Sequence, residues 1–329
     1  MTSLFKTYGL MTMISSLAIC QSCTSTELLD NMGDTDYKPD VISISLSAPR
    51  VETRADATHK LRYTARLFKG NTETGSIQFV QKKQMLEGES STVLVFEGVE
   101  EGTYTITLFA DYVPSSTVAD ENGEYPDHYY DTSQNEDIEM KEFGKEFINN
   151  DHYDCFGKYI VVKKEAEEKR ETVALPRIVA KVRLVGNESS MPVTPTKVNI
   201  TRFSTLLSYK LTSGFASSIY RYPQGDVPGG NWEITPSANT DNELFYFYTF
   251  AATPSINNGK AQTLGYLSFS VEADELDPVA TDINSGEIQV RPNYITTVNG
   301  DFVPALPEDP ETRTDRIILD LSSLGGWGD

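Results

Sequence analysis

Residues 60–68, KLRYTARLF, decide the fold class of this 329-residue chain, because apolar and polar side chains alternate along them. The apolar positions are Leu61, Tyr63, Ala65 and Leu67, and the polar positions between them are Arg62, Thr64 and Arg66. Successive side chains of a β-strand point to opposite faces of its sheet. The stretch therefore predicts a strand whose apolar face lies on a hydrophobic core.

The same period of two recurs along the rest of the chain. The stretches predicted to be strands are VISISLSA (41–48), TVLVFEGV (92–99), GTYTITLFADYV (102–113), CFGKYIVVKK (155–164), ETVALPRIVAKVRLVG (171–186), KVNITRF (197–203), ELFYFYTFAAT (243–253), TLGYLSFSVEA (263–273), EIQVRPNYITTV (287–298) and RIILDLSSL (316–324). Many short strands, separated by Gly, Pro, Asn and Asp, predict an all-β chain of β-sandwiches. Because ELFYFYTF is apolar on both faces, we expect it to be a fully buried central strand. Pro176 lacks an N–H and indicates an edge position or a strand break.

Length and charge limit the possible classes of protein. The chain is long enough for two domains, each with its own core. Its 48 acidic and 28 basic residues give a formal net charge of -20. A surface of this sign repels phosphate backbones and anionic lipids, so we expect no nucleic-acid partner.

The N-terminal residues read as an export signal. The apolar run YGLMTMISSLAI (8–19) is too short to cross a bilayer. With the two cysteines that follow it, the stretch resembles a bacterial lipoprotein signal, in which a small residue precedes the cysteine that is lipidated. Ser22 precedes Cys23, whereas bulky Ile19 precedes Cys20, so we assign lipidation to Cys23. The alternative is an ordinary signal peptide that is cleaved nearby without lipidation.

Four segments follow from these observations. They are a lipoprotein signal peptide (1–22), a flexible acidic leader (23–40), an N-terminal β-sandwich domain (41–175) and a C-terminal β-sandwich domain (176–329). The leader is polar and contains Gly, Asn and Pro, which is typical of a flexible linker. We place the domain boundary just before the stretch PRIVAKVRL.

Catalytic motifs do not appear in the sequence, which contains neither the GxSxG nucleophile elbow nor the HExxH zinc motif. His59, His128 and His152 stand in polar, loop-like contexts, so we interpret each as a solvated surface histidine. A periplasmic hydrolase would need one of them to meet a nucleophile in the fold. We expect the protein not to be an enzyme and to need no cofactor.

Two groups of residues could bind a ligand, and each also has a simpler structural interpretation. The acidic loop offers oxygen ligands that could hold calcium, namely Asp120, Asn122, Glu124, Asp127 and Asp131. The simpler interpretation is that the loop is only solvated. Sugars could stack on a group of aromatic residues, namely Tyr220, Tyr222, Trp232, Tyr246 and Tyr248. Because aromatic residues that alternate along a strand usually belong to the core, we favour core positions for them. Cys155 has no second cysteine beyond the leader and is predicted to be a buried free thiol.

Six stretches, taken in order, resemble the motif series of the fimbrillin-like proteins. They are KLRYTARLF, FEGVEEGTYTITLFADYV, YYDTS, NNDHYDCFG, LPRIVAKVRLV and RPNYITTVNGDFV, and the resemblance runs from about residue 41 to the C-terminus. Fimbrillin-like proteins are pilus subunits and pilus-associated lipoproteins of Gram-negative anaerobes. These motifs are structural rather than catalytic, and their shared order carries the resemblance.

The resemblance implies two transthyretin-like, Greek-key β-sandwich domains in tandem, on a lipoprotein exported through the periplasm to the outer membrane. It implies other fimbrial subunits as partners and assembly by donor-strand exchange. An arginine-specific protease would remove the first strand, and a strand of the next subunit would then fill the open groove.

Carried onto this sequence, the resemblance assigns each part of that mechanism to particular residues. The processing site is Arg54 or Arg50. The displaced strand is VISISLSA, and the side chains that face inward are Ile42, Ile44 and Leu46. The donor strand is RIILDLSSL, and the side chains that it presents are Ile317, Leu319 and Leu321.

Two alternatives remain open beside the polymerising subunit. If neither arginine is cleaved, the first strand stays in place and the protein is an anchor, a cap or a monomeric surface lipoprotein. The second alternative is a non-polymerising, glycan-binding surface lipoprotein, against which the scarcity of tryptophan (Trp232 and Trp327) counts. In an adhesive role, the ligand would belong to a host or bacterial surface.

Overall fold

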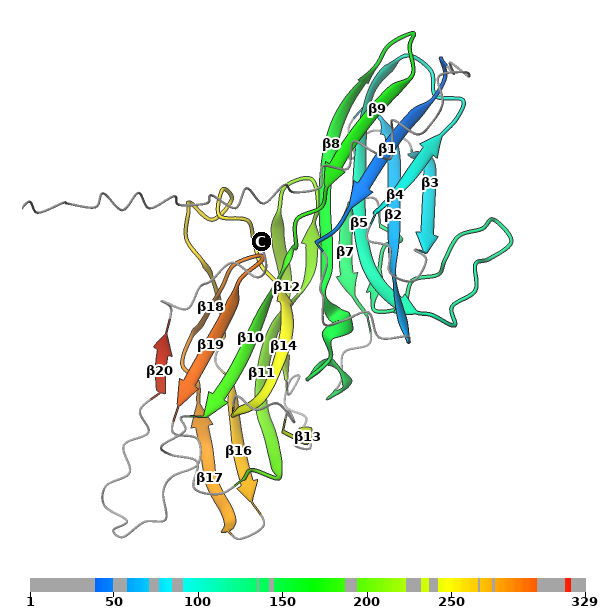
Figure 1. Ribbon diagram of the computed structural model, residues 1–329. Helices are drawn as coiled ribbons and strands as arrows, with labels where there is room; N and C mark the ends of the chain where they lie inside the picture. The colour runs from blue at the N-terminus through cyan, green and yellow to red at the C-terminus, as the bar shows by residue number, and fades with distance from the viewer. Residues whose placement is uncertain are drawn as a thin grey trace, which may run out of the picture.

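The computed structural model of the chain describes residues 39–49, 58–70, 77–84, 91–134, 136–141, 145–186, 194–222, 232–236, 242–265, 267–273, 276–300 and 317–320. Regular structure in these ranges consists of strands and two short 3-10 helices, which confirms the predicted all-β class. Figure 1 shows the strands gathered into two elongated groups that follow one another along the molecule. A helix with the length and hydrophobicity of a membrane span is not found in these ranges.

The first group consists of two sheets. One has the strand order β4-β1-β9, and the other has the order β3-β2-β5-β8. The strands are β1 (Ile42–Ser47), β2 (His59–Lys69), β3 (Ile77–Gln84), β4 (Ser91–Phe96), β5 (Gly102–Pro114), β8 (Cys155–Lys164) and β9 (Lys169–Ala174).

Side chains of both sheets meet in a first hydrophobic core. Strand β1 contributes Ile42, Ile44 and Leu46, and β2 contributes the apolar residues of the 60–68 stretch. The predicted apolar face of this stretch therefore lies on the core. The polar face is buried as well, since the exposed fractions of Arg62 and Arg66 are 0% and 5%.

The second group contains the remaining strands. One sheet has the order β14-β10-β19-β20, a larger one has the order β17-β16-β11-β7-β6 with β12 and β13 also paired to β11, and β15 pairs with β18. The strands are β6 (Tyr130–Asp131), β7 (Asp137–Met140), β10 (Val179–Gly186), β11 (Lys197–Lys210), β12 (Phe215–Tyr222), β13 (Trp232–Ile234), β14 (Glu243–Phe250), β15 (Gln262–Leu264), β16 (Ser268–Ala273), β17 (Leu276–Asn284), β18 (Ile288–Val290), β19 (Ile295–Gly300) and β20 (Ile317–Asp320).

Strand β14 carries the ELFYFYTF stretch, and all of its residues are buried, as predicted. Its predicted central position is wrong, because among the described strands β14 ends its sheet and pairs only with β10. Strand β11 of the larger sheet also contacts β14. One such contact is the hydrogen bond from the Leu206 amide to Thr249 Oγ1, at 3.1 Å. Contact with a second sheet thus buries a strand that has one neighbour within its own sheet.

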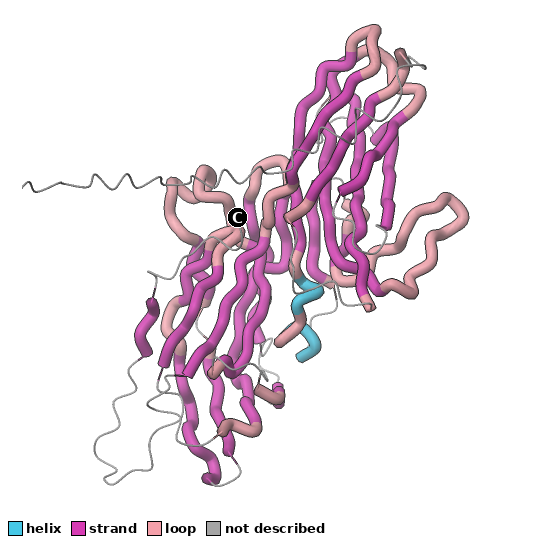
Figure 2. The backbone as a smooth tube through the Cα atoms, viewed as in Figure 1, coloured by secondary structure: helices cyan, strands magenta, loops and turns pink. Residues whose placement is uncertain are grey.

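Residues 130–155 pass from the first group to the second and back. After β6 and β7 come the 3-10 helices η1 (Lys145–Phe147) and η2 (Asp151–Tyr153), and β8 then returns to the first group. Figure 2 shows these two turns in cyan where the two groups meet. A second hydrophobic core, which lies mainly within the second group, includes Phe147, Tyr153 and Ile178, whereas Leu175 packs into the first core. Residues 130–155 therefore contribute to the second core although they precede the predicted domain boundary at residue 175. That boundary stays a prediction, and so does the transthyretin-like arrangement of the strands.

Candidate functional site: the first strand and its slot

Strand β1 lies in the middle of its three-stranded sheet, between two strands that are distant from it in sequence. It pairs antiparallel with β4, with Ile44 opposite Leu94, and parallel with β9, with Ile44 opposite Glu171. Each ladder holds all of β1, from Ile42 to Ser47. The space between β4 and β9 is therefore a slot one strand wide, which we call the β1 slot.

The side chains of β1 are buried on both faces. Ile42, Ile44 and Leu46, predicted to face inward, are at most 1% exposed and belong to the first core. The hydrophobic contribution of each such side chain is about 1.5–3 kcal/mol. On the other face Ser43 and Ser45 are 2% and 3% exposed. Ser43 Oγ donates a hydrogen bond to Glu168 Oε1 at 3.1 Å, whereas Ser45 Oγ has no hydrogen-bond partner among the described residues.

Hydrogen bonds also hold the main chain at both ends of β1. Before it, the carbonyls of Pro39, Asp40 and Val41 accept hydrogen bonds from Lys164 Nζ, the Val99 amide and the Lys169 amide, respectively. At its end, the carbonyl of Ser47, the last residue of β1, accepts a hydrogen bond from the Leu175 amide at 2.8 Å. The slot thus binds the main chain from residue 39 to residue 47.

The predicted processing and lipidation residues lie outside the described residues. Cys23 precedes the first described range, and Arg50 and Arg54 fall between Pro49 and Thr58, where the description stops and resumes. These assignments stay predictions.

The predicted donor strand is partly described. Ile317 and Leu319 belong to β20, which pairs antiparallel with β19 at the end of its sheet, and Leu321 lies outside the described residues. Figure 1 shows β20 in red at the outer edge of the second group, far from the blue β1 in the first group. The donor role stays a prediction.

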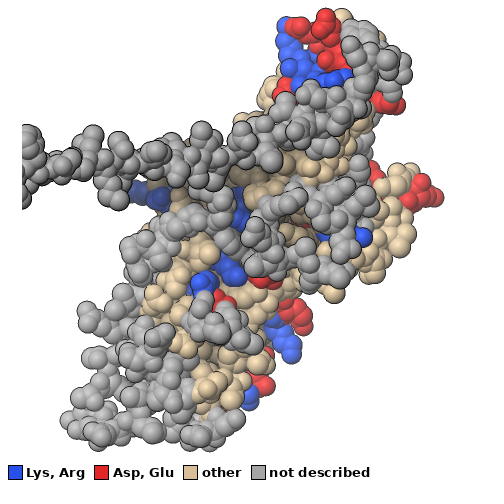
Figure 3. Space-filling model, viewed as in Figure 1, with Lys and Arg blue, Asp and Glu red and all other residues tan. Residues whose placement is uncertain are grey.

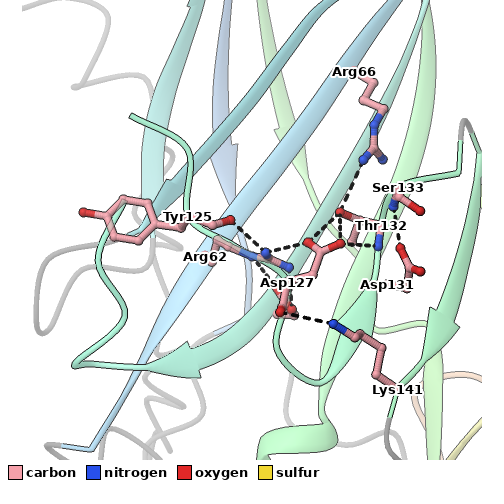
Figure 4. Close-up of polar contacts among 9 residues, drawn as sticks. Arg62, Arg66, Tyr125, Asp127, Asp131, Thr132, Ser133 and Lys141 are labelled. Atoms are coloured by element: carbon pink, nitrogen blue, oxygen red, sulfur yellow. Dashed lines mark hydrogen bonds and ion pairs between the residues drawn. The ribbon is translucent and has the colours of Figure 1, made fainter. Parts of the chain in front are cut away.

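A buried ion-pair network ties the acidic loop to β2. Figure 4 shows the Arg62 guanidinium at its centre. Arg62 Nε and Nη2 donate to the two carboxylate oxygens of Asp111 at 2.9 and 2.8 Å, and Nη1 donates to Asp127 Oδ1 at 2.7 Å and to the Tyr125 carbonyl at 3.1 Å. Burial alone would lower the pKa of Arg62, but the charges and hydrogen bonds of Asp111 and Asp127 outweigh it and raise the pKa.

Arg66 lies further along β2, and its buried charge is less well compensated by carboxylates than that of Arg62. Its Nη2 donates to Thr132 Oγ1 at 3.3 Å, and Thr132 is bonded in turn to Asp127. Burial lowers the pKa of Arg66, and the negative charges of Asp127 and Glu124 only partly offset it.

The carboxylates proposed as calcium ligands are engaged separately rather than gathered around one point. Asp127 pairs with Arg62, Asp120 Oδ1 accepts hydrogen bonds from the amides of Asn122 and Glu124, and Asp131 Oδ1 accepts one from the Ser133 amide. In the described part of the chain, no group of three metal-ligating side chains comes together. The network instead fixes the shape of the loop.

The three histidines, each interpreted as a solvated surface residue, gather around Tyr129. His128 is exposed, whereas His59 and His152 are partly buried. The rings of His59 and His152 stack with their centroids 3.3 Å apart, and His59 Nε2 lies 2.8 Å from the Tyr129 hydroxyl. His128 meets the Tyr129 ring edge-on at 4.4 Å. Local sequence patterns could not reveal this grouping, since strand β2, a loop and η2 supply one histidine each.

The carboxylates nearest to His152 in sequence bind other residues. Asp151 Oδ1 lies 3.1 Å from Lys181 Nζ and accepts a hydrogen bond from the Tyr248 hydroxyl at 2.8 Å. Asp154 forms a buried two-point ion pair with Arg177, at 2.7 and 3.0 Å. Through Asp151, η2 is held against β10 and β14 of the second group.

The aromatic residues proposed as a sugar platform belong to the core where they are described. Tyr246 and Tyr248 are 9% and 0% exposed, and Trp232 packs on Phe203 with ring centroids 5.6 Å apart. The side chains of Tyr220 and Tyr222 lie outside the description. Cys155 is a buried free thiol, as predicted, and burial raises its pKa.

Comparisons with known proteins place the chain in a family. Residues 35–306 match the family model described as "Family of unknown function (DUF6562)". No curated protein sequence matches the chain.

Several solved structures are similar to the chain at low sequence identity. The tip fimbrial protein Mfa3 from Porphyromonas gingivalis is 13% identical, with a TM-score of 0.37 over 82% of this chain and 96% of that one. A fimbrial assembly protein from Parabacteroides distasonis is 12% identical, with a TM-score of 0.38 over 79% and 90%. A candidate polysaccharide-binding protein from Bacteroides thetaiotaomicron is 11% identical, with a TM-score of 0.44 over 80% and 93%.

Proposed function

Because the chain belongs to DUF6562, a family of unknown function, we propose its role from its own residues: it is a structural or adhesive component of a cell-surface fimbria. The ordered series of fimbrillin-like stretches supports this role, and so does the way in which β1 is held. The proposal includes no enzymatic activity.

The observation that carries the proposal is the position of β1 between β4 and β9. Withdrawal of β1 would leave unpaired N–H and C=O groups on both neighbours and an apolar groove where Ile42, Ile44 and Leu46 had been. A groove of this kind binds an extended strand by β-augmentation, in which main-chain hydrogen bonds give affinity and side-chain pockets give specificity.

The order of the elements makes β1 separable by a single cut. Arg50 and Arg54 stand between β1 and β2 in the sequence, so cleavage after either one would leave β1 attached to the later strands through non-covalent contacts alone. In the proposed cycle an arginine-specific protease makes this cut, β1 leaves, and the C-terminal strand of the next subunit fills the β1 slot. The donor would present Ile317, Leu319 and Leu321 to the vacated groove.

The same proposal accounts for an uncut form. With β1 in place and Cys23 acylated, the protein would remain tethered to the outer membrane as an anchor or cap of the fimbria. Cleavage after Arg54 would release the polymerising form with Ala55 as its first residue.

Cleavage of the exported chain with an arginine-specific protease tests the proposal. We expect unheated samples of the cleaved protein to form a ladder of oligomers on a denaturing gel, and heating to collapse the ladder. The variant with Arg50→Gln and Arg54→Gln together should stay monomeric. Release of β1, confirmed by mass spectrometry, without any ladder would reject the polymerising version. Mass spectrometry of the protein from cells would show an acylated Cys23 if the anchored form exists.

A further inference from the structure

The β1 slot ends at a buried ammonium group. Lys164, the last residue of β8, is 2% exposed. Its Nζ donates to the carbonyls of Glu165 and Glu167, at 2.5 and 2.6 Å, and to the carbonyl of Pro39. Two of these acceptors belong to the turn that follows β8, and the third belongs to the segment that leads into β1.

Lys164 occupies a core-facing position of β8. Burial alternates along the end of this strand, and Val162, two residues earlier on the same face, belongs to the first core. The neighbouring Lys163 points outward, with 75% of its side chain exposed, and pairs with Glu165. Figure 3 shows such basic and acidic side chains side by side at the upper end of the first group. Burying a charged amine is strongly unfavourable unless acceptors surround it, so Lys164 depends on its three carbonyls.

The side chains of β1 fix its register only weakly. The strand reads ISISLS, so a slip by two residues would again place apolar side chains in the core and serines on the other face. The main-chain ladders to β4 and β9 can also form after such a slip, because they do not depend on side-chain identity.

Pro39 breaks this repetition. Pro39 and Asp40 form a turn, and proline cannot donate to a ladder, so the extended strand begins after them. The turn directs the Pro39 carbonyl to Lys164 Nζ. A slipped strand would move the Pro39 carbonyl away from Lys164 Nζ and place extended residues at that end of the slot.

We propose that Lys164 is the register-setting residue of the β1 slot, and that it selects an occupant strand whose end turns or terminates beside it with a carbonyl or carboxylate oxygen. For β1 itself, this inference rests on the hydrogen bonds of Lys164 and on the turn at Pro39. Its extension to an incoming strand rests on the proposed function. The loss of one hydrogen bond to a buried charged group corresponds to about tenfold or more in an equilibrium constant.

Hydrogen exchange of the intact exported chain tests the resident strand. In Lys164→Met we expect amides 41–48 to exchange about tenfold or more faster than in the wild type. Lys163→Met, the matched control one residue away, should leave them unchanged. If Lys164→Met does not fold, Lys164→Gln replaces it with a shorter neutral donor. Unchanged protection of β1 in the folded variant would overturn the inference.

Peptide binding to the cleaved protein tests the incoming strand. Acetylated peptide 40–49 places its acetyl carbonyl at the position of Pro39, whereas acetylated peptide 41–49 offers Lys164 no carbonyl. The wild type should prefer the longer peptide by about tenfold or more, and Lys164→Met should lose most of this preference. An equal preference in both proteins would overturn the selection by Lys164. If neither peptide binds to the wild type, the proposed donor-strand exchange is rejected, and with it the role of Lys164 toward an incoming strand. The hydrogen-exchange measurement still decides the role of Lys164 in holding β1.

Discussion

Arg62 of β2 and Asp111 of β5 face each other across neighbouring strands as a two-point ion pair, and neither side chain has exposed surface. The pair lies on the face of the sheet that is turned away from the first core. It therefore depends on the acidic loop, which supplies Asp127 as the second carboxylate.

Removal of the Arg62 charge should destabilise the fold strongly. In Arg62→Met, Asp111 would remain buried without its partner, and breaking a buried pair in this way typically costs about 3–5 kcal/mol. Chemical denaturation would measure the loss. The control is Lys69→Met, which removes an exposed ion pair with Glu100 and should leave the midpoint unchanged. Equal midpoints for Arg62→Met and the wild type would contradict the assigned importance of the network.

The two serines of β1 should respond in opposite directions to loss of the hydroxyl. Ser45 Oγ is buried and has no partner within the described part of the chain, so Ser45→Ala should raise the free energy of unfolding by about 1 kcal/mol. Ser43 Oγ bonds Glu168, so Ser43→Ala should lower it by about 1 kcal/mol. Denaturant titration of both variants checks the contrast, and a shift of the same sign in both would refute it. Under the proposed function, Ser45→Ala should also slow the release of β1 after cleavage.

A side chain at Gly214 should strain the turn between β11 and β12. Gly214 has φ +72°, and an added Cβ would lie 2.6 Å from Thr253 Oγ1. Gly214→Ala should therefore lower stability by about 1–3 kcal/mol. Gly123 has a similar φ of +78° with open space around it, so Gly123→Ala should lose less. Thermal unfolding would compare them, and adding Thr253→Ala to Gly214→Ala should restore part of the loss.

Alkaline pH should weaken the second core through Tyr209. Burial raises the pKa of Tyr209 from its ordinary 10 to about 12, and the electrostatic interaction with nearby Cys155 acts in the same direction. Because the folded chain favours the neutral phenol, this contribution to stability is fully present below about pH 10 and is lost as the pH rises towards about 12. Tyr209→Phe cannot ionise here, so its stability should fall by about 2–3 kcal/mol less than that of the wild type over this range. Denaturation from neutral pH to about pH 12 measures the difference, and parallel curves would contradict it.

Local periodicity predicted the elements better than it predicted their partners. The strand at residues 60–68 and its apolar face were predictable, because both follow from side-chain alternation along one segment. The burial of Arg62 was not, since its partners Asp111 and Asp127 lie 49 and 65 residues away in sequence. Strand β14 illustrates the same limit: its composition predicts burial, but composition does not reveal whether a second strand or another sheet covers it.

The candidate site shows the same division between local and distant information. The inward side chains of β1 follow from the sequence, whereas the neighbours that hold it, β4 and β9, are set by the topology. The grouping of His59, His128 and His152 also depends on contacts between distant segments. Lys164 carries no sequence signal beyond a lysine at an apolar position of an alternating strand.

The two ladders of β1 also determine how the strand would respond to mechanical tension. Each ladder runs the full length of the strand, one antiparallel and one parallel, so a pull along the strand axis loads both rows of hydrogen bonds in shear at once. A pull across the sheet would instead unzip them one bond at a time. Any strand seated between β4 and β9 would therefore resist force along its own axis far better than peeling. Under the proposed function, axial force is the load that such a strand would carry in a filament.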